Sequence, residues 1–254
     1  MRSIKTKLRA AACIAILCLT LTSPAQAQLT VGTGGSVDLG GGSANLGCTD
    51  LVVNGAMHIG NGALASVRNV DFAGTLDGGS GSLLFSGDWN PGGNFLAGTG
   101  TVANQDGCGL STSRIGGSGN FYTFIAIATT PRRLVFASGT TQTIVHELGL
   151  VGHAGALLTL RSDTPGQFAS LDLANGAAQN IGYVDVADNK AIGQPLAPGA
   201  PAQYNSIDSG NTQGWFSKFI DPVAKVVPTP TLSIWGLLIL ATLSVGIGLR
   251  RRLC

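Results

Sequence analysis

The chain has 254 residues, of which 44% are hydrophobic and 11% are charged, and its formal net charge is +2. That charge describes the ends of the chain, because seven of its fifteen Lys and Arg residues lie there: Arg2, Lys5, Lys7, Arg9, Arg250, Arg251 and Arg252. The rest of the chain carries eight basic residues against thirteen acidic ones. Nucleic-acid binding needs a basic face, so this composition excludes that class of partner.

Residues 1–27 have the layout of a secretory signal peptide. A basic segment at 2–9 precedes an apolar run at 10–22, and Ala25-Gln26-Ala27 forms a small-x-small cleavage site. The apolar run is short for a membrane span, although an uncleaved N-terminal anchor is the alternative. We predict cleavage after Ala27 and export through the inner membrane.

Residues 228–254 have the layout of a membrane anchor. Residues 232–249 contain no charged side chain and are followed directly by Arg250, Arg251 and Arg252. Eighteen helical residues span roughly 27 Å, close to the about 30 Å of a bilayer core. A buried core helix is the alternative. We predict a transmembrane helix at 232–249, with the arginine cluster 250–252 on the cytoplasmic side.

This tail also resembles a known sorting signal. Its first residues are Pro230, Thr231, Leu232, Ser233, Ile234, Trp235 and Gly236. With the helix and the basic end that follow, they resemble the IPTL-CTERM signal of Gram-negative bacteria, whose core is Ile-Pro-Thr-Leu-Ser-Glu-Trp-Gly. Thr229 stands in place of its Ile, and Ile234 in place of its Glu. The resemblance implies an exosortase-type processing enzyme as partner, cleavage near the motif, and transfer of a membrane-anchored precursor to the cell surface or outer envelope.

The five cysteines separate by position. Cys13 and Cys18 leave with the signal peptide, and Cys254 lies at the cytoplasmic end. Cys48 and Cys108 remain in an oxidising compartment, where an even number of cysteines indicates disulfides. Two distant cysteines supply too few ligands for a metal site. We therefore predict one Cys48–Cys108 disulfide, with two unpaired thiols as the alternative.

The region 28–216 lies before a linker at 217–227 and reads as all-β. No window of ten or more residues shows helical periodicity, and short apolar runs alternate with Gly-Gly, Asn-Gly, Gly-Asn and Asp-Gly turns. The predicted strands are 29–31, 36–39, 51–53, 56–59, 70–72, 82–85, 121–127, 133–136, 143–145, 157–160, 170–173 and 183–186. They recur about every twenty residues, which favours a right-handed parallel β-helix. A β-sandwich or irregular β-roll is the alternative, because hairpins use the same turns.

A second resemblance covers most of this region. Motifs such as Cys48-Thr49-Asp50-Leu51-Val52-Val53 and Gly98-Thr99-Gly100-Thr101-Val102 are similar to the passenger regions of surface β-helix proteins that carry this tail. Further motifs at 67–70, 87–90, 139–144, 158–162, 183–188 and 208–216 fit the same pattern. They also resemble repeats of adhesin-like and filamentous-haemagglutinin-like proteins. The resemblance implies a structural, surface-exposed role without catalytic residues.

Several residues are candidates for chemistry. His146-Glu147 precedes His153 by too many residues for the His-Glu-x-x-His zinc pattern, because Leu occupies position 150. Two sets of carboxylates invite comparison with β-helix enzymes, which gather such side chains on one strand face. These sets are Asp71, Asp77 and Asp88, and Asp163, Asp185 and Asp188 with Arg161. Asp beside Gly or Asn is more typical of turns. We therefore predict no catalytic residue, no metal and no cofactor.

The sequence thus predicts an exported, non-catalytic surface protein with a role in adhesion or in envelope or matrix structure, with surface glycans or matrix as candidate partners. The alternative is a carbohydrate-active β-helix enzyme, a polysaccharide lyase or hydrolase. An enzyme should bring three or more carboxylate or basic groups into one groove, whereas a structural protein should scatter them among its turns.

Overall fold

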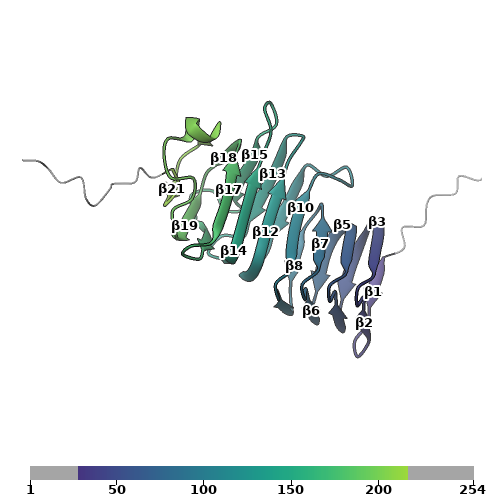
Figure 1. Cartoon of the computed structure of the whole chain (residues 1–254). Helices are drawn as coiled ribbons and strands as arrows, with labels where there is room; N and C mark the ends of the chain where they lie inside the picture. Colours follow the sequence, from purple (N-terminus) through teal and green to yellow (C-terminus); the bar gives the residue numbers. More distant parts are fainter. Residues whose placement is uncertain (1–27, 217–254) are drawn as a thin grey trace, which may run out of the picture. The chain divides into compact units, whose positions relative to one another are not determined.

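The computed structural model describes residues 28–216, and they form a β-solenoid of about eight turns of parallel strands. Figure 1 shows the strands stacked from β1 to β21 along one axis. The predicted signal peptide, linker and C-terminal helix lie outside the described residues. Within 28–216, no helix is long and apolar enough to cross a membrane.

Each coil contributes a strand to three faces of the solenoid. Face 1 contains β1 (Leu29–Val31), the second parts of β3 (Ser43–Val53) and β5 (Ala63–Phe72), β8 (Trp89–Pro91), β11 (Thr112–Ile115), β13 (Arg132–Phe136), β15 (Leu158–Ser162), β18 (Val184–Val186) and β20 (Ile207–Asp208). Face 2 contains the first parts of β3 and β5, then β7 (Ser82–Phe85), β10 (Thr101–Gln105), the second parts of β12 (Gly119–Ile127) and β14 (Thr141–Val151), and β17 (Ala178–Gly182). Face 3 contains β2 (Ser36–Asp38), β4 (Ala56–His58), β6 (Thr75–Asp77), β9 (Asn94–Leu96), the first parts of β12 and β14, β16 (Ala169–Leu173), β19 (Asn189–Gly193) and β21 (Thr212–Gln213). The paired strands are parallel, so the all-β prediction is confirmed and the sandwich alternative is wrong.

The core runs through the middle of the coils. Side chains alternate along each strand, so that Leu51 and Val53 point inward while Val52 between them points outward. Equivalent inward positions stack from coil to coil: Leu64 pairs with Leu83, and Leu83 pairs with Val102 at the same sequence interval. The later coils are longer, since the partner of Glu147 is Ala178. The predicted spacing therefore holds best in the first four coils.

Glycines occupy the corners where these coils stack most closely. Gly55, Gly74 and Gly93 recur at one constant interval, each directly over the backbone of the preceding coil. A Cβ on Gly74 would meet the carbonyl oxygen of Gly55 and lie 2.7 Å from the carbonyl carbon of Asn54. Only a residue without a side chain fits this corner, because backbone atoms of the coil below cannot move aside.

The strand predictions missed mainly the polar strands. Those not predicted include β6, β8, β9, β11, β17 and β19, although each pairs in register with its neighbours. Several carry Asn, Asp, Lys or Gln, which single-sequence patterns assign to turns. In a solenoid the neighbouring coils supply the hydrogen bonds, so that a weakly β-forming segment adopts the register of the coil before it.

We expect the substitution Gly74→Ala to lower the free energy of unfolding by about 1–3 kcal/mol, because the added methyl group has no space against the preceding coil. Gly32→Ala is the matched control, since a Cβ there meets nothing within 4 Å, and it should change stability by less than about 0.5 kcal/mol. Urea denaturation followed by circular dichroism measures both. Equal stability of the two variants would contradict the tight stacking of this corner.

Candidate binding groove

The solenoid has one break in the hydrogen-bonded ladder of its described strands, between β9 and β12 on face 3. Among these strands, β9 pairs only with β6. The N–H of Asn94 donates to the carbonyl of Gly74 at 2.8 Å, and Leu96 accepts from the N–H of Gly78 at 2.8 Å. Successive residues of a strand direct their backbone groups to opposite sides. The N–H and C=O of Phe95 therefore face β12 without a strand partner.

Face 1 also has few paired residues between these two coils, whereas the pairing on face 2 is continuous. β8 pairs with β11 only through Trp89 and Ile115, because the chain then continues into Pro91, which has no N–H to donate. On face 2, all five residues of β10 pair with β12, from Thr101 to Gln105. The fifth coil is thus held along face 2 and separates from the fourth at the corner between faces 1 and 3.

Two adjacent hollows lie at this opened corner, and we refer to them together as the step groove. One has a volume of about 440 Å³ and the other about 300 Å³, and both are lined by Phe72 and Pro91. The first is further lined by Val52, Asn54, Asp71, Ala73, Asn90, Gly92, Gly116 and Gly117. The second is further lined by Trp89, Gly93, Asn94, Phe95, Ser118, Gly119, Asn120, Thr141 and Thr143.

An aromatic cluster forms the floor beneath this groove and links the two coils on face 3, where their strands do not pair. The rings of Phe95 and Trp89 are 5.0 Å apart, and those of Phe95 and Phe121 are 5.6 Å apart, centroid to centroid. Phe72 and Phe121 each pack against Trp89 as well. Trp89 is only 1% exposed, so it is a core residue. Aromatic packing therefore replaces backbone pairing where β9 and β12 diverge.

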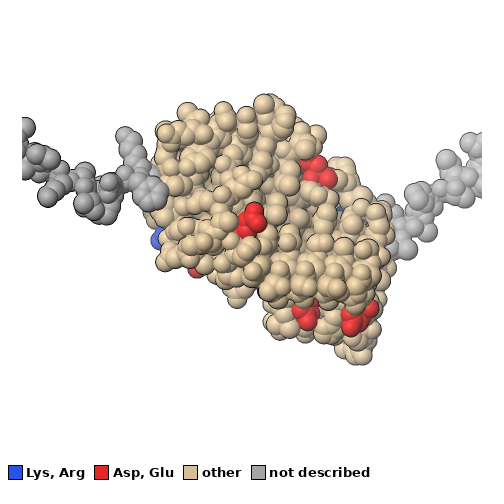
Figure 2. Space-filling view, viewed as in Figure 1, with Lys and Arg blue, Asp and Glu red and all other residues tan. Residues whose placement is uncertain are grey.

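The walls of the groove carry neutral hydrogen-bonding groups. Asn54, Asn90, Asn94, Asn120, Ser118, Thr141 and Thr143 present amides and hydroxyls. Asp71 is the only ionisable side chain that lines either hollow, and it accepts a 2.7 Å hydrogen bond from Nδ2 of Asn90. Figure 2 shows that charged atoms are sparse on the face it draws and lie in separate spots. The groove is thus suited to a neutral ligand with many hydroxyl or amide groups.

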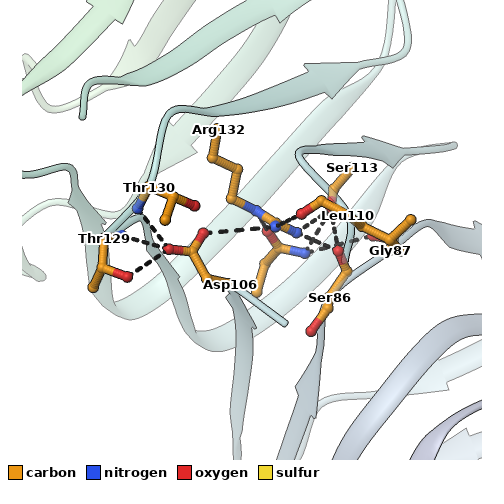
Figure 3. Close-up of polar contacts among 9 residues, drawn as sticks. Ser86, Gly87, Asp106, Leu110, Ser113, Thr129, Thr130 and Arg132 are labelled. Carbon is orange, nitrogen blue, oxygen red and sulfur yellow. Dashed lines mark hydrogen bonds and ion pairs between the residues drawn. The ribbon is translucent and has the colours of Figure 1, made fainter. Parts of the chain in front are cut away.

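The corner between faces 2 and 1 is closed by a buried arginine (Figure 3). The side chain of Arg132 is fully buried, and its guanidinium donates to the carbonyls of Leu110 (2.9 Å) and Ser86. It also donates to Oδ1 of Asn104 at 3.0 Å and to Oγ of Ser113 at 2.6 Å. These partners come from the two preceding passages of the chain through the same corner. One side chain therefore links three stacked levels of the solenoid, because it satisfies interior polar groups of the two levels beneath its own.

Asp106 lies beside this arginine, with Oδ1 at 3.8 Å from Nη1 of Arg132. Its other oxygen, Oδ2, accepts hydrogen bonds from the N–H and hydroxyl of Thr129 and from the N–H of Thr130, at 2.6, 2.7 and 2.8 Å. Burial alone would raise the pKa of Asp106, but these hydrogen bonds together outweigh burial and hold the pKa below its ordinary value of 3.8.

We expect the ionised form of Asp106 to stabilise the fold above about pH 4, the pKa range of an unfolded Asp. Because its pKa is lowered in the folded state, this contribution is lost as the pH falls through the folded-state pKa. Asp106→Asn should therefore be less stable at pH 7, and its stability should fall less steeply between about pH 4 and pH 2. Chemical denaturation across that range measures the slope. Parallel pH profiles for the two proteins would contradict the assignment.

The predicted disulfide is confirmed. Cys48 and Cys108 are bonded, with their Cα atoms 5.3 Å apart, and 60 residues separate them in the sequence. Cys48 lies inside β3, and Cys108 lies in the loop between β10 and β11 that also supplies Asp106 and Leu110. The bond thus fixes this loop to a much earlier coil.

We expect the double substitution Cys48→Ser/Cys108→Ser to lower the free energy of unfolding by up to about 4 kcal/mol, the chain-entropy value for a closed loop of this length. Reduction of the wild type with dithiothreitol should give a similar loss and should leave the double variant unchanged. Denaturant midpoints measured with and without reductant test this. A wild-type midpoint that is insensitive to verified reduction would contradict it.

The carboxylates considered in the sequence do not meet in one groove. In the first set, Asp71 lies on β5 and Asp77 lies on β6. Asp77 accepts a hydrogen bond from the N–H of Gly79, and Asp88 accepts one from the N–H of Arg114. In the second set, Asp163 accepts the N–H of Ser138, Asp185 pairs with Arg161 at 2.8 Å, and Asp188 accepts from Asn211. Hydrogen bonds from Ser138 lower the pKa of Asp163 despite the opposing effect of its burial, and Thr164 and the Arg114 charge add to this. Within the two sets, only Arg161 and Asp185 are brought together, whereas Asp163 lines a separate hollow with Arg133 and with Arg114, whose Nη2 is 3.3 Å from Oδ2 of Asp163.

The histidines have individual partners. Nδ1 of His58 lies 3.2 Å from Oδ2 of Asp77, which occupies the equivalent position one coil later. His146 stacks on Tyr122 with ring centroids 4.5 Å apart. His153 lies in the turn after β14. Within 28–216, no three His, Cys, Asp or Glu side chains are grouped so that they could hold a metal ion.

The remaining predicted sites lie outside the described residues. They are the cleavage-site residues Ala25 and Ala27, and the sorting residues Pro230, Thr231, Leu232, Ser233, Trp235, Gly236, Arg250, Arg251 and Arg252. The step groove, by contrast, was not predicted. Pro91, followed by a pair of glycines, was the one available signal, because it cannot donate to a following strand.

Comparison of the chain with protein-family models, with curated proteins and with solved structures found no match.

Proposed function

We propose that this is an exported, non-catalytic surface protein whose right-handed β-helix acts by contact, in adhesion or in envelope or matrix structure. The segments at both ends of the sequence support export, membrane anchoring and sorting by an exosortase-type enzyme. The confirmed Cys48–Cys108 disulfide is compatible with an oxidising compartment.

One observation carries the contact role: the step groove is lined by amides, hydroxyls and apolar groups, with a single carboxylate that is already hydrogen-bonded. Acid–base cleavage of a glycan uses two carboxyl groups placed on either side of the scissile bond. Asp71 has no such counterpart among the residues that line the groove. The groove therefore favours holding a ligand over cleaving it.

The chemistry of the walls favours a neutral glycan as the ligand. A sugar chain presents hydroxyls that can exchange hydrogen bonds with Asn94, Asn120 and Thr141, and apolar ring faces that can rest on Phe95 and Pro91. An acidic polysaccharide would need basic partners, and neither hollow is lined by Lys or Arg. We therefore propose that neutral polymers of the matrix or of a neighbouring surface bind here.

Affinity electrophoresis in gels that contain a neutral β-glucan tests this proposal. We expect the mature protein to be retarded, and Asn94→Ala/Asn120→Ala to bind about tenfold more weakly, as the loss of one or two net hydrogen bonds predicts. The control is Asn175→Ala/Asn180→Ala, which removes two exposed asparagines outside the groove. It should bind like the wild type.

Three results would contradict the proposal. Equal retardation of the groove variant and the control would exclude this groove as the binding site. Retardation by polygalacturonate alone would exclude a neutral ligand. Release of reducing ends or of unsaturated products from either polymer would support the carbohydrate-active enzyme instead.

A further inference from the structure

The N-terminal end of the solenoid presents three strand edges. Among the described residues, β1, β2 and the first part of β3 each pair with a strand of the second coil and with no strand on the opposite side. Val31 accepts from the N–H of Asn54 at 2.8 Å, so Thr30 beside it directs its backbone groups away from the solenoid. The carbonyl of Gly42 accepts a hydrogen bond from the N–H of Ala63 at 3.0 Å, so the backbone groups of the next residue, Ser43, also point away from the solenoid.

The interior of the first coil is only partly covered. Val31 is buried there, but four other inward-facing apolar residues are half-buried, whereas their counterparts one coil later are at most 1% exposed. The four pairs are Leu29 and Leu51, Val37 and Met57, Leu39 and Ile59, and Ala44 and Leu64. The hydrophobic core thus reaches this end of the solenoid without a closing layer among residues 28–216.

This edge lacks the usual protection against pairing with another chain. Exposed edge strands generally carry Lys, Pro or inward-pointing charges that block association. Residues 28–49 contain no Lys, Arg, Glu or Pro, and their only charged side chain is Asp38, which bonds the N–H of Gly40 in its own turn. The edge therefore combines free hydrogen-bonding groups, apolar surface and low charge.

The C-terminal end of the described region is different. A 3₁₀ helix (Pro201–Tyr204) and the buried residues Leu196, Trp215 and Phe216 lie there. The indole Nε1 of Trp215 donates to Asn189 at 2.8 Å. Two strands at this end, β20 and β21, also pair on one side only among the described strands, but they have two residues each and match the longer N-terminal edges poorly. Head-to-tail stacking is therefore disfavoured, and two N-terminal ends can meet only about a two-fold axis.

We propose that the N-terminal end is an interface for a second copy of this chain, in which the two first coils meet end to end and their strand edges pair antiparallel. The inference rests on the proposed export in one respect: cleavage after Ala27 leaves Gln28 as the only residue before β1. One residue is too short to cover three strand edges. A second copy supplies edges of the same length and apolar residues at the same spacing.

The test uses the exported full-length protein extracted from the envelope in detergent. Intact mass identifies the N-terminus, and light scattering after size exclusion gives the number of chains. We expect two chains per particle for the protein that begins at Gln28. Thr30→Pro/Ser43→Pro removes two outward N–H groups and leaves the pairing to the second coil intact, so it should weaken association at least tenfold. Thr30→Ala/Ser43→Ala keeps both N–H groups and should remain a dimer.

If the proline variant fails to fold, a second measurement on the wild type tests the same interface. In the wild type, hydrogen exchange of the β1 and β2 amides should slow as protein concentration rises, while exchange at β14 should not change. A particle of one chain that begins at Gln28, with concentration-independent exchange, overturns the proposal and leaves export intact. One chain that retains residues 1–27 overturns both the proposed cleavage and the second copy as occupant. Dimers that persist equally in the proline variant would place association in another part of the chain and also overturn the proposal.

Discussion

The structure depends on the backbone hydrogen bonds between successive coils. Parallel strands must lie about 4.8 Å apart over their whole length, so every corner of a coil lies directly on the corner before it. A side chain at such a corner has no space, which explains why Gly55, Gly74 and Gly93 recur once per coil. The spacing of the paired strands therefore requires glycine at these corners. Because glycine lets the coils stack closely, the inward-facing Leu, Val, Ile and Phe side chains can pack in regular rows.

The fourth and fifth coils show what happens when that constraint is relaxed. Pro91 cannot continue the ladder, β9 and β12 diverge, and the rings of Trp89, Phe95 and Phe121 fill the interior instead. Another corner keeps its register through Arg132, which bonds groups from the two levels beneath its own. A surface hollow can therefore form at one corner without loss of the axial stack.

The sequence predicted the fold class and the disulfide because both depend on local or countable features. Short apolar runs that recur at a nearly regular spacing indicate a solenoid, and Cys48 and Cys108 were the only two cysteines left outside the terminal segments. Polar strands such as β17 and β19 were missed because their strand character comes from the coil beneath them. The groove was missed for a related reason: it arises where two distant strands fail to pair, and a failure of pairing leaves almost no pattern in either segment.

The disulfide has a mechanical consequence for a protein built as a stack. Force applied along the axis to the N-terminus pulls directly on the bonds between coils and can peel them away one after another. Once residues 28–47 have detached, however, the load passes from Cys48 through the sulfur–sulfur bond to Cys108. The chain from 49 to 107 then bears no tension, so a pull from the N-terminus does not extend this part of the chain, and one covalent bond passes the load on to the coils that follow Cys108.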